Sequence, residues 1–386
     1  MNKVSVLILA ADGTQSLPIA ESLCKHGYDV HGFFGHKMSY GYASRYFRHK
    51  TIVTSDDEQA FLKTIIDYVK VHGIDVLFPM SDATAELISK NSEVLEKTVK
   101  FVAPPYDVFR KGYDKNQLMT ACERYGIPHP RTIDLETTGK ESIDDNIFPA
   151  LIKPNITCGG RGMTLVRSMK DFEEKYENIR SQYGACHLQE FIEAGGRQVK
   201  AQLFVDREGK LLCSSVMHKQ RFYPEKGGSS SCNTTIDDDD TISKCMTILK
   251  NIHWVGFADF DLIEDPKDGV LKIMEINPRV PACVKSAVKA GADYAELYVD
   301  YALGKKTKKY SVKSGYTLRH LGFETLWFMQ SKDRFHTKPS WFKFWGSKIY
   351  YQDCSLKDPF TFVAGSMENI IKLANPAFRK SKSGTR

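Results

Sequence analysis

Long apolar runs are absent from this 386-residue sequence. None approaches the roughly 20 residues that a membrane-spanning helix needs, which argues against an integral membrane protein. The opening residues 3–13, KVSVLILAADG, hold only a short apolar core, and a turn follows it in place of the small-residue cleavage site of a signal peptide. We therefore expect this segment to form a first β-strand.

Cysteine pairs with the spacing of a disulfide framework are also lacking. The nine cysteines are scattered along the chain and include no CxxC pair. Together with the missing signal peptide, this predicts a cytoplasmic protein with free thiols. Internal repeats and low-complexity segments are not found either.

One region of the sequence, the C-terminal tail at residues 301–386, contains few acidic residues. Residues 301–386 hold 17 Lys and Arg but 5 Asp and Glu, a net charge of +12, whereas the first 300 residues carry 37 − 42 = −5. The basic character therefore belongs to the tail and says nothing about the chemistry of the body. Because no recognition motif accompanies this charge, we do not expect nucleic-acid binding.

Residues 1–110 alternate between two patterns. Short apolar runs with β-branched residues alternate with segments whose apolar residues have helical spacing. This alternation is typical of a parallel sheet covered by helices, so we predict an α/β, Rossmann-like domain. The turn AADGTQS at residues 10–16 could hold a ligand at the next helix N-terminus. Because the sequence is not GxGxxG, a simple tight turn is the favoured interpretation.

A lysine lies inside the apolar strand pattern FPALIKP at residues 148–154. Because an unpaired ammonium is unfavourable in apolar surroundings, we expect Lys153 to have an anionic partner. Gly159, Gly160 and Gly162 follow, and a glycine loop lets backbone N–H groups approach phosphate oxygens. This combination indicates triphosphate binding, although the spacing is not the Walker pattern GxxxxGK[ST]. A glycine-rich hairpin beside a lysine that reaches solvent is the alternative.

A hairpin with three oxygen-bearing side chains predicts a metal site. The segment DPKDG at residues 265–269 has the composition of a turn. The turn lies midway between Asp261 and Glu275, so these residues should lie opposite each other, or nearly so, on one face of the hairpin. Asn277, two residues after Glu275, should share that face. Two like charges held this close need a cation, and three oxygen ligands suit Mg²⁺. Arg279 would neutralise developing negative charge beside them. A solvent-facing acidic edge is the alternative.

Together these motifs resemble the ATP-grasp superfamily, in particular its carbamoyl-phosphate-synthase-like and D-aspartate-ligase-like carboxylate–amine ligases. The resemblance covers roughly residues 1–300, and the EINPR ending with an upstream acid and an IKP lysine is specific in combination. The residues that carry it are Lys115, Ile152-Lys153-Pro154, Gly159-Gly160-Arg161-Gly162, Gln189-Glu190-Phe191-Ile192, Asp261 and Glu275-Ile276-Asn277-Pro278-Arg279.

The resemblance implies that ATP binds with Mg²⁺, or with Mn²⁺ in its place. Lys115 and Lys153 would contact the phosphates, and the loop from Cys158 to Met163, with its glycines and Arg161, would fold over them. The segment Gln189 to Ile192, which contains Glu190 and Phe191, would hold adenine through backbone groups.

The resemblance also implies the remaining ligand contacts. Glu193 is available for the ribose, while Gln198 follows Gly196-Arg197 where the family often has a glutamate. The metal would be bound by Asp261, Glu275 and Asn277. Arg279 would stabilise an acyl phosphate.

A domain order follows from the same resemblance. Residues 1–110 would form the Rossmann-like domain, residues 111–305 a two-lobed ATP-grasp domain, and residues 306–386 a small C-terminal extension. Within the ATP-grasp domain, residues 111–188 would form the lid subdomain and residues 189–305 the metal-binding, catalytic subdomain.

Three basic residues, His218, Lys219 and Arg221, precede a Gly/Ser loop. Such a group could hold a carboxylate substrate beneath a lid, and we assign catalytic roles to Lys219 and Arg221 together with Arg279. A solvated strand end with a loose connector is an equal alternative. Cys232 has no pattern of His and Asp partners and is expected to be a plain thiol.

The tail combines lysines with Trp341 and Trp345. Lys and Arg with interfacial Trp can mark an anionic membrane surface or a lipid-linked substrate. The same composition suits a small appended domain whose aromatic residues pack on the body, and packing is the favoured interpretation.

The sequence thus predicts a cytoplasmic, Mg²⁺- and ATP-dependent ligase that joins a carboxylate to an amine, with an amino acid as one substrate. The acceptor could be an anionic or lipid-linked envelope precursor, with peripheral association at the inner membrane surface. Dimers are common in the families that it resembles, so a homodimer is one expected assembly. The alternatives are a bicarbonate-activating enzyme, like biotin carboxylase or carbamoyl-phosphate synthase, and a non-catalytic ATP-binding regulatory protein.

Overall fold

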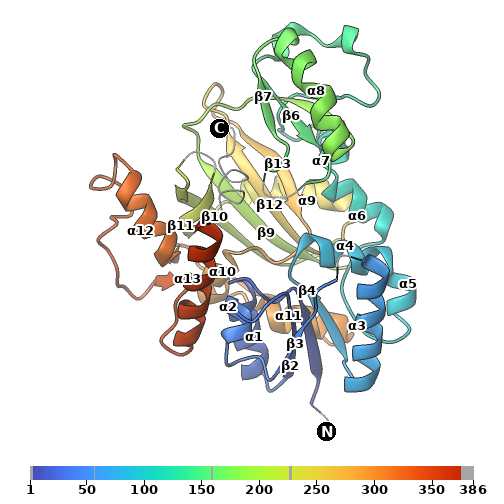
Figure 1. Ribbon diagram of the computed structural model, residues 1–386, viewed down its shortest axis with the longest axis vertical. Helices are drawn as coiled ribbons and strands as arrows, with labels where there is room; N and C mark the ends of the chain where they lie inside the picture. Colours follow the sequence, from blue (N-terminus) through green and yellow to red (C-terminus); the bar gives the residue numbers. More distant parts are fainter. Residues whose placement is uncertain (1–2, 56, 158–159, 226–227, 375–386) are drawn as a thin grey trace.

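The computed structural model of the protein describes residues 3–55, 57–157, 160–225 and 228–374. Its mixed α/β fold contains one parallel sheet and two mainly antiparallel sheets. The N-terminal sheet lies at one end of the molecule, a small sheet at the other, and a large sheet between them (Figure 1). Within the described ranges, no helix is both long enough and apolar enough to cross a membrane.

The N-terminal sheet has four parallel strands in the order β3-β2-β1-β4. The strands are β1 (Ser5–Leu9), β2 (Asp29–Phe34), β3 (His49–Ile52) and β4 (Val76–Pro79). The helices of this part are α1 (Ser16–Lys25), α2 (Tyr40–Ala43), α3 (Glu58–His72), α4 (Asp82–Lys90) and α5 (Ser92–Leu95). Because side chains alternate between the two faces of a strand, Val6 packs in a cluster with residues of α1, whereas Leu7 packs with residues of α3 to α5. The alternation of strands and helices therefore builds a parallel sheet covered on both faces.

The small sheet is antiparallel and has the order β5-β8-β6-β7. Two helices and two 3₁₀ turns accompany its first strands: α6 (Tyr106–Tyr113), α7 (Lys115–Arg124), η1 (Lys140–Ser142) and η2 (Asp145–Ile147). The strands and the covering helix are β5 (Thr132–Asp134), β6 (Ala150–Pro154), β7 (Thr164–Val166), α8 (Met169–Tyr183) and β8 (Cys186–Glu190). Buried Phe172 and Tyr176 of α8 join Ile152 in the core of this lobe.

The large sheet has seven strands in the order β13-β12-β9-β10-β11-β14-β15. Its strands are β9 (Gln198–Val205), β10 (Leu211–Tyr223), β11 (Ser229–Ile236), β12 (Gly256–Glu264), β13 (Leu271–Asn277), β14 (Thr317–Arg319) and β15 (Ile349–Tyr351). The helices between them are α9 (Asp239–Asn251), α10 (Val284–Ala290) and α11 (Tyr294–Ala302). Residues of α9 pack on one face of the sheet and residues of α10 and α11 on the other, which also contacts the N-terminal sheet.

The tail is built into the body of the protein. Its strands β14 and β15 extend the large sheet beyond β11, α12 (Leu321–Gln330) packs on β10 and β11, and α13 (Pro359–Ala374) lies against α2 (Figure 1). The indole of Trp341 donates a hydrogen bond to the carbonyl of Glu324 and packs on Phe328, so these contacts lie within the tail and not on the body. Trp345 is 84% exposed, so the prediction that the tail's aromatic residues pack on the body does not hold for it.

Candidate active site

A cleft of about 530 Å³ lies where the N-terminal sheet, the large sheet and the tail meet. The N-terminal sheet contributes the turn at residues 12–15 and Asp82, which follow β1 and β4 at the carboxyl edge of the sheet. The large sheet contributes residues of β9, β10 and the β12–β13 hairpin. The tail contributes His320, Phe323, Gln352, Glu368 and Asn369. The weak ligand signal at residues 10–16 therefore falls partly on a cleft wall.

The β12–β13 hairpin forms the acidic floor of this cleft. Asp261 pairs directly with Glu275 across the two strands, and Asn277 pairs with Asp259. The predicted pairing of Asp261 with Glu275 is present, and a register shift between Asp261 and Leu262 contributes to it, since Leu262 pairs with Ile273. The four oxygen-bearing side chains therefore share one face of the sheet.

Two lysines from neighbouring strands neutralise this floor. Lys200 on β9 contacts Asp259 and lies 2.9 Å from Oδ2 of Asp261, and Lys219 on β10 lies 2.8 Å from Oδ1 of Asp261. Burial opposes ionisation of Asp261, but the two ammonium groups outweigh it and hold the pKa of that carboxyl well below its usual range. Burial, opposed by Lys200 and reinforced by the charge of Asp261, raises the pKa of Asp259 to about 6.

The oxygen-bearing side chains of the hairpin fit a hard divalent cation. They comprise carboxylates and an amide on one face, and Oδ1 of Asp259 is buried without a hydrogen-bond partner among the described residues. The amide nitrogen of Asn277 lies 3.3 Å from Oδ2 of Asp261, and its Oδ1 accepts a hydrogen bond from Arg279.

Asp259 and Lys200 were missed by the sequence prediction. The spacing of Asp259 and Asp261 was a usable signal, since residues two apart in a strand share a face.

Arg279 connects the hairpin to the N-terminal sheet. Its Nε lies 3.0 Å from Oδ1 of Asp82, at the start of α4, and its Nη2 donates to Asn277. Burial opposes its charge, but Asp82 and Asp259 outweigh that effect and raise the pKa of the guanidinium. Arg279 therefore remains a cation at the cleft wall.

Lys115 links the small sheet to the hairpin. Asp114 accepts hydrogen bonds from the backbone N–H groups of Asn116 and Gln117 and so caps α7, which holds Lys115 at its first position. The Lys115 ammonium lies 2.7 Å from the carbonyl oxygen of Thr157, in the loop after β6, and 3.6 Å from Oε2 of Glu275. The Lys115 ammonium thus contacts both the loop after β6 of the small sheet and the β12–β13 hairpin of the large sheet.

The other residues predicted to bind nucleotide lie on the small sheet, outside the walls of the 530 Å³ cleft. Lys153 is buried in β6, and its ammonium donates to Oε1 of Gln189 on β8, at 2.7 Å. Glu190 pairs with Lys272 of β13 at 3.1 Å, while the N–H of Phe191 donates to the carbonyl of Pro149. Ile192 and Glu193 follow the end of β8, and Glu193 is exposed.

The glycine loop is described in part. Gly159 lies outside the described residues. Gly160 and Gly162 adopt positive φ angles of 73° and 75°, a region that glycine occupies without strain, and Arg161 between them is exposed. A β-carbon on Gly162 would come within 2.7 Å of the Pro154 ring, so this turn packs closely on the end of β6.

Arg221 does not line the cleft, unlike Lys219 two residues before it. The ladder between β10 and β11 shifts register between these residues, so Lys219 pairs with Asn233 and Arg221 with the adjacent Cys232. This bulge turns Arg221 away from the side that Lys219 faces. Its guanidinium is 1% exposed and pairs with Glu324 of α12. The catalytic assignment of Arg221 is therefore not retained.

The tail residues that line the cleft are held by contacts across the fold. Gln352 donates to Thr14 at 2.7 Å, and Asn369 of α13 donates to the hydroxyl of Tyr40 at 3.0 Å. Nδ1 of His320 lies 3.0 Å from Oδ2 of buried Asp353. The sequence analysis named none of these tail residues as part of the site.

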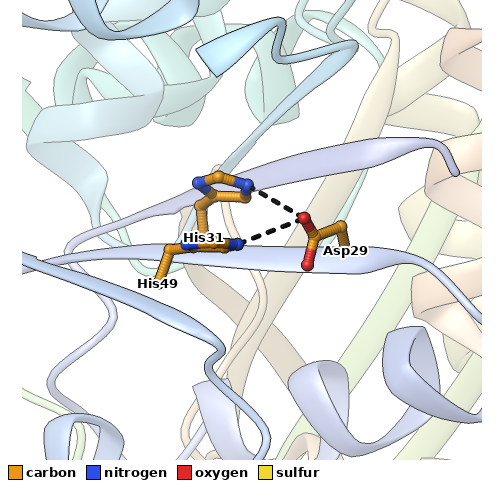
Figure 2. Close-up of side chains that lie close together, drawn as sticks. All are labelled: Asp29, His31 and His49. Carbon is orange, nitrogen blue, oxygen red and sulfur yellow. Dashed lines mark hydrogen bonds and ion pairs between the residues drawn. The ribbon is translucent and has the colours of Figure 1, made fainter. Parts of the chain in front are cut away.

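A second group of possible metal ligands lies away from the cleft, at the opposite edge of the N-terminal sheet. Asp29 and His31 on β2 and His49 on β3 share one face, and Nε2 of each histidine lies near Oδ2 of Asp29, at 3.5 and 3.2 Å (Figure 2). The two imidazole rings are stacked, with centroids 4.1 Å apart and planes 19° apart. Because a nitrogen lone pair lies in its ring plane, these lone pairs run side by side and do not converge on one ion. The arrangement therefore fits hydrogen bonding to Asp29 better than chelation.

The family to which the protein belongs is identified by a family model that matches the central part of the chain. Residues 114–309 match the family model described as carbamoyl-phosphate synthase L chain, ATP binding domain. The chain therefore belongs to this ATP-grasp family, and the resemblance predicted from the motifs is confirmed.

Individual relatives are more distant. The large chain of carbamoyl phosphate synthase from Thermoanaerobacter pseudethanolicus is 26% identical over 265 residues, which is 64% of this chain and 24% of that protein. The D-aspartate ligase of Enterococcus faecium is 24% identical over 252 residues, which is 58% of this chain and 59% of that protein. The chain thus spans less than two thirds of the length of either relative.

A solved structure shares the fold. The biotin carboxylase domain of the 2-oxoglutarate carboxylase from Hydrogenobacter thermophilus, crystallised with MgADP and bicarbonate, superimposes with a TM-score of 0.68 at 17% identity. The match covers 82% of this chain and 74% of that one, so the fold relationship extends well beyond residues 114–309.

Proposed function

We propose that this protein is an ATP-dependent ligase that joins a carboxylate to an amine through an acyl-phosphate intermediate, with release of ADP. The observation that carries the proposal is the hairpin floor of the cleft. Asp261, Glu275 and Asn277 face one space there, with Arg279 beside them and Lys115 reaching across from the small sheet. These are the groups that phosphoryl transfer needs, since its catalysis depends on positioning and on neutralising charge.

ATP would lie between the small sheet and the hairpin. Lys115 and Lys153 would contact its phosphates, and the turn that contains Gly160, Arg161 and Gly162 would cover them. The backbone of residues 189–192 would hold the adenine ring, and Glu193 would receive the ribose hydroxyls. The contact of Lys115 with both the loop after β6 and Glu275 supports this placement, because a γ-phosphate between the lobes would meet that ammonium.

Mg²⁺, or Mn²⁺ in its place, would be held by Asp261, Glu275 and Asn277. When bound, the ion supplies positive charge to the phosphate oxygens. Lys219 already holds one oxygen of Asp261, so it is placed to guide an incoming carboxylate toward the same point. Arg279 would stabilise the charge of the acyl phosphate while the amine attacks its carbonyl carbon and phosphate leaves.

The remaining walls of the cleft would select the two substrates. The body supplies cationic groups at the floor, whereas the turn after β1 and the tail supply Asp12 and Glu368. A cleft with cationic groups at one part and carboxylates at another suits a substrate that carries both a carboxylate and an ammonium. We infer that one substrate is an amino acid.

The domain division inferred from the sequence is part of this proposal. Residues 1–110 and 306–386 would supply substrate-selecting walls around an ATP-grasp domain at residues 111–305. In that domain, residues 111–188 would close over ATP and residues 189–305 would hold the metal. The tail's contributions to the cleft support a role in the reaction for residues 306–386.

The proposal is tested by measuring ADP release from Mg-ATP across a panel of L- and D-amino acids and small carboxylates. We expect one compound to raise the rate, and Asp261→Asn and Glu275→Gln to abolish that rise. Asp268→Asn is the matched control, because Asp268 lies in the turn of the same hairpin and is partly exposed outside the cleft.

Two outcomes would replace the proposal. Release of ADP stimulated by bicarbonate alone would assign the protein to bicarbonate activation. ATP binding that stabilises the fold, without ADP release under any condition including envelope-precursor acceptors, would assign it a regulatory role.

A further inference from the structure

The helix α13 has an unusual distribution of side chains. Every exposed residue between residues 359 and 371 is apolar. These residues, which we call the α13 outer face, are Pro359, Phe360, Val363, Met367, Ile370 and Ile371. Their spacing of three and four places them along one side of the helix. A helix on the surface of a protein normally shows the reverse distribution, with its apolar side inward.

Polar contacts fix α13 in this orientation. The hydroxyl of Ser44 donates to Asp358 at 2.6 Å, just before the helix, and Asn369 donates to Tyr40 near its other end. Between them Gly365 lies against Tyr40 so closely that a β-carbon would come within 2.2 Å of its ring. The polar side of α13 is therefore the docked side, and the apolar side is turned outward by specific contacts.

The tail that contains this apolar face is rich in basic residues. Residues 375–386, which follow α13 in the sequence, contain four Lys and Arg and no Asp or Glu. Elsewhere in the tail, exposed Phe342 and Trp345 alternate with exposed Lys343 and Lys348. Apolar and aromatic side chains interleaved with lysines are the composition of a surface that lies on anionic lipid.

We propose that the α13 outer face docks on the surface of a bilayer that contains anionic phospholipids. Its apolar side chains would enter the boundary between headgroups and acyl chains, and the basic residues of the tail would contact the phosphates. A second copy of the chain is a poorer partner, because a symmetric contact through α13 would bring together two tails of net charge +12 each. Charge complementarity thus favours lipid.

Docking would also orient the cleft. Glu368 and Asn369 line the cleft from the inner side of the same helix whose outer side would meet the lipid. If the proposed ligase function holds, the acceptor that this geometry favours is a molecule held at the membrane surface. The membrane contact itself does not depend on that function.

The test is sedimentation of the full-length protein with vesicles. Vesicles of phosphatidylcholine alone are compared with vesicles that also contain phosphatidylglycerol, at low and high salt. We expect binding to the anionic vesicles, release at high salt, and at least about tenfold weaker partitioning for the double variant Val363→Asp/Ile370→Asp, which removes two of the apolar contacts.

A matched double variant keeps the result interpretable. Val71→Asp/Val94→Asp introduces the same charges at exposed valines of α3 and α5, and it should bind like the wild type. Thermal unfolding of both variants checks that the fold is intact.

Three results would overturn the proposal. The first is equal or absent binding to the two kinds of vesicle. The second is unchanged binding of the α13 variant. The third is a wild-type dimer in light scattering that the α13 variant converts to a monomer, which would assign the face to a second copy. None of these results depends on ADP release, so the two proposals fail independently.

Discussion

Replacing Arg221 separates a structural role from the catalytic role that the sequence predicted. Arg221 and Glu324 are each 1% exposed and are joined by two hydrogen bonds, at 2.8 and 2.5 Å. The same guanidinium donates to the carbonyl of Pro339 at 2.6 Å. Arg221→Met removes these bonds, and removing one partner of a buried pair costs about 3–5 kcal/mol.

The expected loss lies at the lower end of that range, because Arg319 also pairs with Glu324, at 2.8 Å. A loss of about 3 kcal/mol can be converted to a temperature with an unfolding entropy of about 2 cal/mol/K per residue. For 386 residues that unfold together, the midpoint should fall by about 4 °C. Differential scanning calorimetry measures this shift.

A surface pair on the same sheet provides the control. Arg197 lies 2.6 Å from Glu264, but its side chain is half exposed, so Arg197→Met should cost less than about 1 kcal/mol. For Arg221→Met, we expect kcat and the KM for ATP to stay within about twofold of the wild type when measured well below the midpoint. A large fall in kcat with an unchanged midpoint would refute this reasoning and return Arg221 to the active site.

Three further predictions concern other parts of the fold. Burial and the neighbouring His49 lower the pKa of His31 to about 4, so the folded protein should lose about 2 kcal/mol of stability between pH 7.5 and pH 5 as the unfolded chain takes up a proton. His31→Gln should reduce that loss in urea titrations at the two pH values, and an unchanged loss would contradict the assignment. Gly365→Ala should lower the thermal midpoint by a few degrees because the added carbon would overlap the Tyr40 ring, and a midpoint equal to the wild type would show that α13 can move aside. Lys115, which lies 3.6 Å from Glu275, would contact phosphate in the proposed placement of ATP, so Lys115→Met should raise the KM for ATP at least about tenfold in ADP-release assays, and an unchanged KM would place the nucleotide elsewhere.

The acidic floor of the cleft could be predicted from the sequence because it depends on local geometry. A turn of recognisable composition places Asp261 and Glu275 at nearly opposite positions of the hairpin, and a one-residue register shift between Asp261 and Leu262 brings them directly opposite. The alternation of strands and helices in the first 110 residues is local in the same sense. Such features need only short-range information about the chain.

The features that were missed depend on distant pairings. Lys200 reaches Asp261 because β9 lies next to β12 in the sheet, although 61 residues separate the two side chains in the sequence. The residues with which the tail lines the cleft could not be named in advance, because β14 pairs with β11 and no local pattern indicates that pairing. Arg221 was misplaced because one bulge reverses the direction of its side chain, and the sequence HKQR does not signal a bulge.

The route of the chain around the cleft has a consequence for synthesis. The floor is made by the hairpin at residues 261–277, whereas one wall is made by residues 320–369, which the ribosome produces later. Strand β14 must also pair with β11 although three helices and the β12–β13 hairpin lie between them in the sequence. A nascent chain that has released only the floor therefore presents carboxylates and lysines to solvent without an enclosed site, and the tail wall of the cleft is completed only when α13 packs against Tyr40.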